Sequence, residues 1–229
     1  MDGKQLYDDV LSSMTQLQKL SFSIHTQLIN DNVEMKPSSS NDIRKSFIEL
    51  GYKHIDVFGH TDFVNHRAES HIYSIPYQFK TFEFMISAFQ GGKFDQVRTL
   101  HMFDRRPFEH RLFQIIARDF PVLQRLLITN WEEQQVKDRS GELITFSHLF
   151  QLGLGKSHID YAMEFLSNGI IVLPRLTSLT ITYQSLATVT NNFTNNQARL
   201  ICSKITRLRT HEPFVRPNNF HLYFPLLSK

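Results

Sequence analysis

The sequence predicts an α/β fold of the solenoid type, with a parallel sheet on a concave side and helices or loops on the convex side. Three observations predict it. A short pattern, apolar-x-x-apolar-x-apolar, recurs at nearly equal intervals through the second half of the chain. Most segments between the copies repeat apolar residues every three or four positions, as helices do. The 229 residues are 41% hydrophobic and 21% charged, a composition that excludes a disordered chain or a collagen-like repeat.

The repeat is most regular in five copies, whose middle residues are spaced by 26, 26, 27 and 29 positions. These middle residues are Leu100, Leu126, Leu152, Leu179 and Leu208. The alternation in each copy predicts a short strand with one buried face. One such unit cannot bury its face alone, so neighbouring units stack and their strands lie parallel, with a crossover between them.

Two earlier copies of the pattern, at Leu17 to Phe22 and at Tyr52 to Val57, are more widely spaced. We therefore expect one domain over 1–229 with three parts. These are less regular repeats in 1–95, regular repeats in 96–212 and a C-terminal cap in 213–229.

Helices are expected between the strands. Apolar stripes with a helical period run over 6–14, 82–89, 108–116, 159–166 and 186–193. Pro107 is placed as the first residue of its helix, and Ser157 and Asp160 have the spacing of a capping box. Phenylalanine occurs 20 times, and we expect these large rings to fill uneven gaps between irregular repeats.

Charge and cysteine content narrow the function classes. Residues 1–95 hold 9 Lys and Arg against 12 Asp and Glu, whereas residues 96–229 hold 16 against 10. This asymmetry favours a partner-facing surface at one end over a chain coated with nucleic acid. The single cysteine, Cys202, excludes a disulfide scaffold and favours a reducing compartment. The first residues lack the apolar core of a signal peptide, and no apolar run approaches 18 residues. We therefore expect an intracellular protein, in the cytoplasm or nucleus.

Motifs for catalysis are weak. Gly153–Ser157 ends like a phosphate-binding loop, but the position that requires the first glycine holds Phe150. A nucleotide-binding enzyme that uses this segment stays as an alternative function. Histidines and one acid gather in a second stretch, at His54, His60, His66, Glu69 and His71. This group lacks cysteine and a helical His pair, so we expect hydrogen-bonded histidines and no metal, cofactor or catalytic residue.

Strand residues that alternate with the core are expected on the concave face. They are Thr99, His101, Phe103, Arg125, Leu127, Thr129, Gln151, Ser178, Thr180, Thr182, Arg207 and Arg209. Their mixture of aromatic, aliphatic and arginine side chains is typical of binding hot spots. Arg207 and Arg209 suit an acidic or phosphorylated protein. RNA is less favoured because no aromatic residue alternates with these arginines.

Several stretches give the chain a family resemblance. They are Asp2-Gly3-Lys4 ahead of Met14-Thr15-Gln16-Leu17, and then 71–77, 107–110, 120–123, 213–217 and 223–227. On these residues the sequence resembles a divergent leucine-rich-repeat solenoid of the ribonuclease-inhibitor-like superfamily. More narrowly, it resembles the repeat half of F-box/leucine-rich-repeat proteins from invertebrates. The resemblance implies a horseshoe that binds protein on its concave face.

In F-box relatives that face presents a substrate to a cullin-based ubiquitin ligase. No segment of this sequence matches the Leu-Pro-x-Glu-like opening of an F-box, so the resemblance covers the repeat half alone. It implies non-catalytic protein recognition, as the substrate-binding half of an F-box-type receptor. Ubiquitin-ligase subunits are expected as partners only if the full-length protein carries an F-box. The alternative is a free-standing scaffold or adaptor unrelated to ubiquitin.

Overall fold

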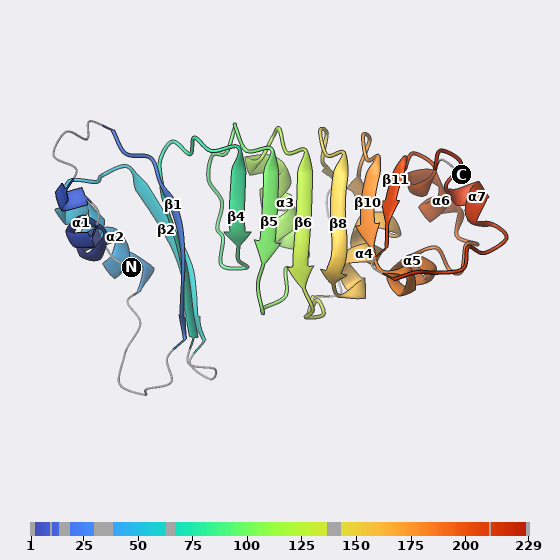
Figure 1. Ribbon diagram of the computed structural model, residues 1–229, viewed down its shortest axis with the longest axis horizontal. Helices are drawn as coiled ribbons and strands as arrows, with labels where there is room; N and C mark the ends of the chain where they lie inside the picture. Colours follow the sequence, from blue (N-terminus) through green and yellow to red (C-terminus); the bar gives the residue numbers. More distant parts are fainter. Residues whose placement is uncertain are drawn as a thin grey trace. The chain divides into compact units, whose positions relative to one another are not determined.

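The computed structural model describes residues 3–9, 11–13, 19–29, 39–62, 67–136, 143–210 and 212–227, which form a mixed α/β structure (Figure 1). The sequence predicts one domain, whereas the structure divides the chain into two compact units. Unit 1 comprises Met1–Gln78 and Ala88–Lys93, and unit 2 comprises Phe79–Ser87 and Phe94–Lys229. None of the helices in the described ranges combines the length and hydropathy needed to cross a membrane.

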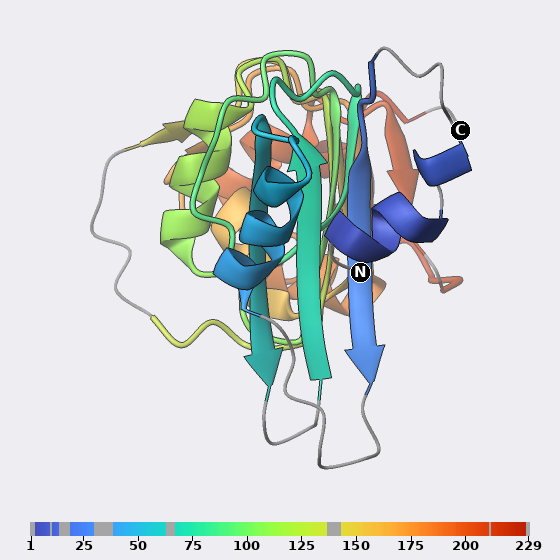
Figure 2. The same cartoon turned by 90° about the vertical axis from the view of Figure 1, so that its left-hand side faces the viewer.

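Unit 1 is a three-stranded antiparallel sheet with two helices. Its elements are α1 (Gly3–Asp9), the 3-10 turn η1 (Leu11–Ser13), β1 (Ser23–Ile29), α2 (Ser40–Glu49), β2 (Ile55–Asp62) and β3 (Arg67–Ser74). The strand order is β1-β3-β2, and α1 and α2 lie on the same face of the sheet (Figure 2). The core on that side contains Leu6, Phe22, Ile43, Phe47, Ile55 and Ile72.

The strand directions in unit 1 correct the prediction of parallel repeats in 1–95. Both β1 and β2 pair antiparallel with β3. Only four residues separate β2 from β3, and Asp62 pairs with Arg67 across that connection. A parallel pair needs a crossover of a dozen or more residues, so this spacing permits only the antiparallel arrangement. Leu17, in the first copy of the pattern, lies outside the described residues.

Unit 2 is built on a six-stranded parallel sheet. Its elements are β4 (Thr81–Met85), β5 (Thr99–Phe103), α3 (His110–Asp119), β6 (Arg125–Asn130), β7 (Ile144–Thr145), β8 (Gln151–Ser157), α4 (Ile159–Leu166), β9 (Ile171–Val172), β10 (Ser178–Ile181), α5 (Tyr183–Val189), α6 (Asn196–Cys202), β11 (Arg207–Arg209) and α7 (Phe220–Tyr223). The large sheet has the order β11-β10-β8-β6-β5-β4, and β7 and β9 form a small second sheet. Helices α3 and α4 lie on one face of the large sheet (Figure 1).

The register of this sheet confirms the α/β prediction with a parallel sheet. The middle residues of the five copies are direct register partners across β5, β6, β8, β10 and β11. Four of them, Leu100, Leu126, Leu152 and Leu179, are at most 1% exposed. The alternation of apolar residues therefore identified the buried face of each of these strands. Phe82 of β4 extends the same row beside Leu100.

The apolar stripe at 82–89, predicted as a helix, contains strand β4 instead. Phe84 has a positive φ of 55°, and the pairing of β4 with β5 shifts register between Phe82 and Met85. This irregularity inserts an extra residue, as a β-bulge does. Residues three apart, Phe82 and Met85, are therefore both buried, and the spacing imitates that of a helix.

The helix predicted over 159–166 is confirmed. The helix predicted over 186–193 is α5, which ends at Val189, so Phe193 lies beyond it with a positive φ of 63°. Two predicted helix starts are also wrong. Pro107 precedes α3, which begins at His110. Ser157 is the last residue of β8 and does not cap α4. The capping residue is His158, whose side chain accepts a hydrogen bond from the backbone N–H of Asp160.

Most phenylalanines are buried inside the two units, which confirms that these rings pack in the core. The buried ones are Phe22, Phe47, Phe58, Phe82, Phe89, Phe94, Phe108, Phe113, Phe120, Phe146, Phe165, Phe193, Phe220 and Phe224. In unit 2 the rings of Phe94 and Phe120 stack with their centroids 4.5 Å apart, and Phe82 meets the Phe94 ring edge-on. Aromatic pairs in these geometries add about 0.5–1.5 kcal/mol beyond the burial of their area.

Candidate functional site

The candidate site is the face of the six-stranded sheet opposite the buried leucines. Buried and partly exposed side chains alternate along β5, β6, β8 and β10. We call the second set, together with the exposed arginines of β11, the open face. It consists of Thr99, His101, Phe103, Arg125, Leu127, Thr129, Gln151, Gly153, Ser178, Thr180, Arg207 and Arg209. Except for Thr182, the structure thus brings all residues predicted for a binding face onto one surface.

The open face is organised in rows that run across the strands. The first row consists of the register partners Thr99, Arg125, Gln151, Ser178 and Arg207. The second row consists of His101, Leu127, Gly153, Thr180 and Arg209. Neighbouring parallel strands lie about 4.8 Å apart, so side chains within a row are immediate neighbours. Each row ends on an arginine of β11.

The second row changes in charge and polarity from one end to the other. At β5, Nδ1 of His101 lies 2.5 Å from Oε2 of Glu83, and both side chains are partly exposed. In the middle, Leu127 occupies the space beside Gly153, where an added Cβ would lie 3.3 Å from Leu127 Cγ. At β11 the row ends on the exposed Arg209. A partner would therefore meet an acidic and histidine-containing end, an apolar centre and a basic end.

The arginines of the open face differ in how they are held. The guanidinium of Arg125 lies over the Phe150 ring, 5.6 Å from its centroid, in a cation–π arrangement. Within the described residues, no carboxylate lies within ion-pair distance of Arg207 or Arg209. Their charges are therefore available to an anionic partner.

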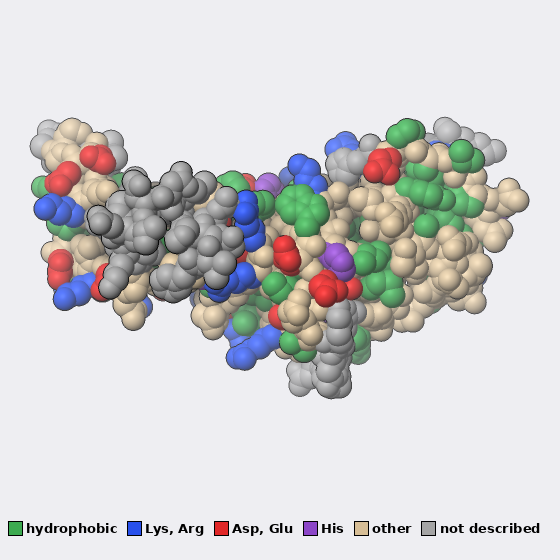
Figure 3. Space-filling model, turned by 90° about the horizontal axis from the view of Figure 1, so that it is seen from below, with side chains coloured by type: hydrophobic (Ala, Val, Ile, Leu, Met, Phe, Trp, Pro, Cys, Tyr) green, Lys and Arg blue, Asp and Glu red, His purple; other side chains and the backbone are tan. Residues whose placement is uncertain are grey.

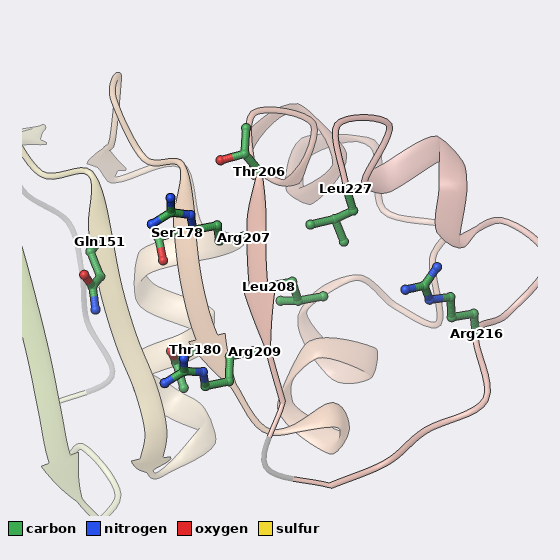
Figure 4. A pocket seen from close by; sticks show the side chains of 9 residues that line it. All are labelled: Gln151, Ser178, Thr180, Thr206, Arg207, Leu208, Arg209, Arg216 and Leu227. Carbon is green, nitrogen blue, oxygen red and sulfur yellow. The ribbon is translucent and has the colours of Figure 1, made fainter. Parts of the chain in front are cut away.

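A hollow of ≈ 490 Å³ lies at the β11 end of the sheet. We call it the basic groove. It is lined by Gln151, Ser178, Thr180, Thr206, Arg207, Leu208, Arg209, Arg216 and Leu227. The side chains of Arg207 and Arg209 extend toward β10, beside Ser178 and Thr180, whereas Arg216 lies on the other side of β11 (Figure 4). The guanidinium of Arg216 is 5.3 Å from the centroid of the Phe220 ring.

Sequence reasoning found one side of the basic groove and missed the other. The strand register identified Gln151, Ser178, Thr180, Arg207 and Arg209. It assigned Leu208 to the buried row and did not include Thr206 or Leu227, and Arg216 counted only as one of several basic residues near the C-terminus. Arg216 and Leu227 follow the last strand, where no repeat spacing relates them to the sheet. The only available signal was the excess of basic residues near the C-terminus.

Thr182 is a correction, because it is a helix cap and not a residue of the open face. Strand β10 ends at Ile181. The Thr182 hydroxyl accepts a hydrogen bond from the backbone N–H of Ser185 at 3.2 Å and donates one to Ser185 Oγ at 2.9 Å. Its conformation and hydrogen bonds are those of an N-cap.

The phosphate-loop motif lies within a strand. Gly153–Ser157 belong to β8. Gly153 pairs with Leu127 and Ser157 with Asn130, while Ser157 Oγ donates to the Leu154 carbonyl at 3.0 Å. A phosphate cradle needs a turn whose N–H groups converge on the anion. The extended segment does not form that turn.

The candidate metal ligands of unit 1 include hydrogen-bonded side chains. Nε2 of His71 lies 2.8 Å from Ser23 Oγ. Oε1 of Glu69 accepts a hydrogen bond from Gln27 Nε2 at 2.9 Å. His66 lies outside the described residues. These two contacts agree with the expectation of hydrogen-bonded polar groups in this stretch.

A buried polar cluster lies in the helices and loops of unit 2, among residues outside the open face. Nδ1 of His110 in α3 lies 2.6 Å from Oε1 of Glu164 in α4, whose side chain is fully buried. Gln134 Nε2 donates to Oε2 of Glu164 at 2.5 Å and to the carbonyl of Phe108 at 2.9 Å. These contacts join α3, α4 and the segment after β6, so the cluster has a structural role.

Unit 2 also carries exposed hydrophobic side chains. In the view from below, hydrophobic side chains gather at the end of unit 2 that holds the C-terminal segment (Figure 3). Leu200 of α6 and Leu222 of α7 are 67% and 49% exposed, and Val215 is 89% exposed. These residues come from the chain around and after β11 and are not members of the open face.

Comparison of the chain with family models, with curated proteins and with solved structures found no match. The functional proposal therefore depends on the residues and geometry of the open face, together with the resemblance stated above.

Proposed function

We propose that unit 2 is a solenoid of the leucine-rich-repeat type, whose open face binds a protein without catalysing a reaction. The repeat supports this proposal because each of five strands follows the previous one after 26–29 residues. The aligned leucines place one strand of each repeat beside the next. Stacked units of this kind share one core and display a continuous sheet surface.

The observation that carries the proposal is the composition of the open face. Its rows combine His101, Leu127 and the arginines of β6 and β11 on a rigid sheet. Aromatic and arginine side chains supply most of the energy in protein interfaces, and preordered strands reduce the entropy lost on binding. The other face is occupied by α3 and α4, so the open face is the sheet surface that can meet a partner.

The charges favour an acidic or phosphorylated protein as the partner. Arg207 and Arg209 end the two rows, and Arg216 lines the same basic groove. Guanidinium groups bind carboxylate and phosphate through paired hydrogen bonds. Complementary charge also speeds the encounter and selects against basic proteins.

The test of this recognition is the double charge reversal R207E/R209E. We expect it to abolish capture of the protein partner. The matched control is R199E/K204E, which changes charge equally at exposed residues that do not line the basic groove. Equal capture by both variants and the wild-type chain would contradict the proposal. Equal loss in both variants would show a response to net charge alone.

The more specific role, as the substrate-binding half of an F-box-type ubiquitin ligase receptor, is supported by the resemblance alone. Its test is affinity capture with the full-length gene product. Recovery of cullin-ligase subunits supports the ligase role. Recovery of a partner without those subunits supports the alternative, a free-standing scaffold or adaptor.

A further inference from the structure

The strand β11 is an edge of the parallel sheet. It pairs with β10 and stands at the end of the strand order. The backbone N–H of Arg207 donates to the Thr177 carbonyl, toward the β10 side. Because successive residues of a strand point their backbone groups to opposite sides, the N–H and C=O of Leu208 point away from β10.

The outer side of β11 opens onto the basic groove. Within the described residues, no backbone hydrogen bond joins Leu208 to a segment on that side. Leu208 is partly exposed, and with Arg216 and Leu227 it lines the groove (Figure 4). An edge strand with unpaired backbone groups is a template for one more strand.

We propose that an extended acidic segment of the protein partner adds to β11 as a further strand. Acidic side chains of that segment lie opposite Arg207 and Arg209, and an apolar side chain between them lies opposite Leu208. This inference rests on the proposed function and specifies its ligand as an acidic-apolar-acidic segment.

The spacing of the arginines matches such a segment. Arg207 and Arg209 are two residues apart on one face, so their Cα atoms are about 6.6 Å apart in a parallel strand. Alternate residues of an added strand have the same separation, so two carboxylates lie in register with Arg207 and Arg209. The two arginine side chains, which extend toward β10 in the free chain, turn toward the added strand to pair with them. The residue between them projects to the opposite face, where Leu208 supplies an apolar neighbour.

Charge complementarity determines which strand is admitted. Two exposed arginines on a short edge repel basic segments, and a neutral strand offers nothing that compensates for the loss of their hydration. An acidic strand satisfies both the edge and the charges. The groove therefore selects by sequence pattern as well as by net charge.

The first experiment measures binding of labelled, blocked peptides to the full chain by fluorescence anisotropy. One peptide carries Glu-Leu-Glu at its centre, and a second, of equal composition, carries Leu-Glu-Glu. We expect the alternating peptide to bind at least fivefold more tightly, because only it places both carboxylates opposite arginines. The variant R207Q/R209Q should weaken its binding about tenfold, the effect of two partly exposed ion pairs. The control variant R199Q/K204Q should change it less than twofold. Equal affinities for the two peptides would overturn the inference.

A second experiment tests the backbone pairing without altering the protein. Single N-methyl groups at successive positions of the Glu-Leu-Glu peptide remove one N–H at a time. We expect binding to fall at alternate positions only, because only every second N–H of a paired strand faces β11. A uniform effect at all positions would overturn strand addition.

These outcomes separate the inference from the proposed function. If peptide pattern has no effect while R207E/R209E still abolishes capture of the protein partner, recognition stands and strand addition is overturned. If inorganic phosphate displaces the peptide and peptide order has no effect, the groove is an anion site and the inference is again overturned. If peptide order has no effect and R207E/R209E also captures the protein partner as well as the wild-type chain does, the proposed function fails too.

Discussion

The sharpest test of the sheet register compares two adjacent leucines of β6. Leu126 is 0% exposed and lies between Leu100 and Leu152 in the buried row. Leu127 is partly exposed and belongs to the open face. L126A should lower the free energy of unfolding by about 3 kcal/mol, because it removes a fully buried side chain and leaves a cavity. L127A should lower it by less than about 1 kcal/mol, because that side chain stays partly in water in the folded state.

The assay is equilibrium unfolding in urea, followed by fluorescence of the single tryptophan. Trp131 follows β6 directly and belongs to unit 2, so it reports on the unit in which both leucines lie. The variant L126A should move the unfolding midpoint to a clearly lower urea concentration than L127A does. Equal midpoint shifts, or a larger shift for L127A, would refute the assigned faces of the strand.

Three further outcomes follow from the contacts of single residues. T182A should lower the free energy of unfolding by about 1 kcal/mol, because α5 loses its N-cap, and it should leave the affinity for the peptide unchanged. A changed affinity would show that Thr182 belongs to the binding face after all. E164A should lower the free energy of unfolding by at least about 2 kcal/mol in the same urea assay, because it leaves His110 buried beside an apolar methyl group. A free energy of unfolding equal to that of the wild-type chain would show that the His110–Glu164 pair is not needed for stability. Burial raises the pKa of the Cys202 thiol to about 12, so a disulfide reagent at pH 8 should modify it only after unfolding, and rapid modification of the folded chain would contradict its burial.

The pH dependence of stability has a defined sign at His25. Burial lowers the pKa of His25 below its ordinary value of 6.5. The unfolded chain then takes up a proton at a higher pH than the folded chain, so this residue reduces stability as pH falls below about 6.5. H25Q should lose less stability than the wild-type chain between pH 7 and pH 5.5. Circular dichroism during urea unfolding at the two pH values measures this difference, and identical pH dependence would contradict it.

The parallel sheet was predictable because its strands are buried on one face only. Alternation between leucine and polar residues then fixes both the strand and its face, and equal spacing aligns neighbouring strands. Leu126 and Leu152 carry that information within the six residues of the repeat pattern. The same alternation predicts Thr180 and Arg209 on the open face, where the structure has them.

Other parts of the fold and of the site could not be predicted, because local backbone features give the same residue spacing as a different structure. The irregularity at Phe84 makes strand β4 bury residues three apart, which is also the spacing of a helix. The four-residue connection between β2 and β3 requires antiparallel pairing, but it can be recognised only once the bounds of both strands are known. Thr182 stands three residues before Ser185, a spacing that fits an N-cap as well as a strand end. Arg216 reaches the basic groove from a segment outside the repeat, so only its tertiary placement reveals it.

Amide hydrogen exchange of the full chain, with and without the Glu-Leu-Glu peptide, tests most directly whether the open face and its β11 edge carry recognition. The Leu208 amide should exchange rapidly in the free chain and become protected when the peptide binds, because its N–H gains a backbone partner. Amides of α3, on the other face of the sheet, should keep their rates. Protection confined to α3 and α4, or unchanged exchange at Leu208 under saturating peptide, would contradict the account.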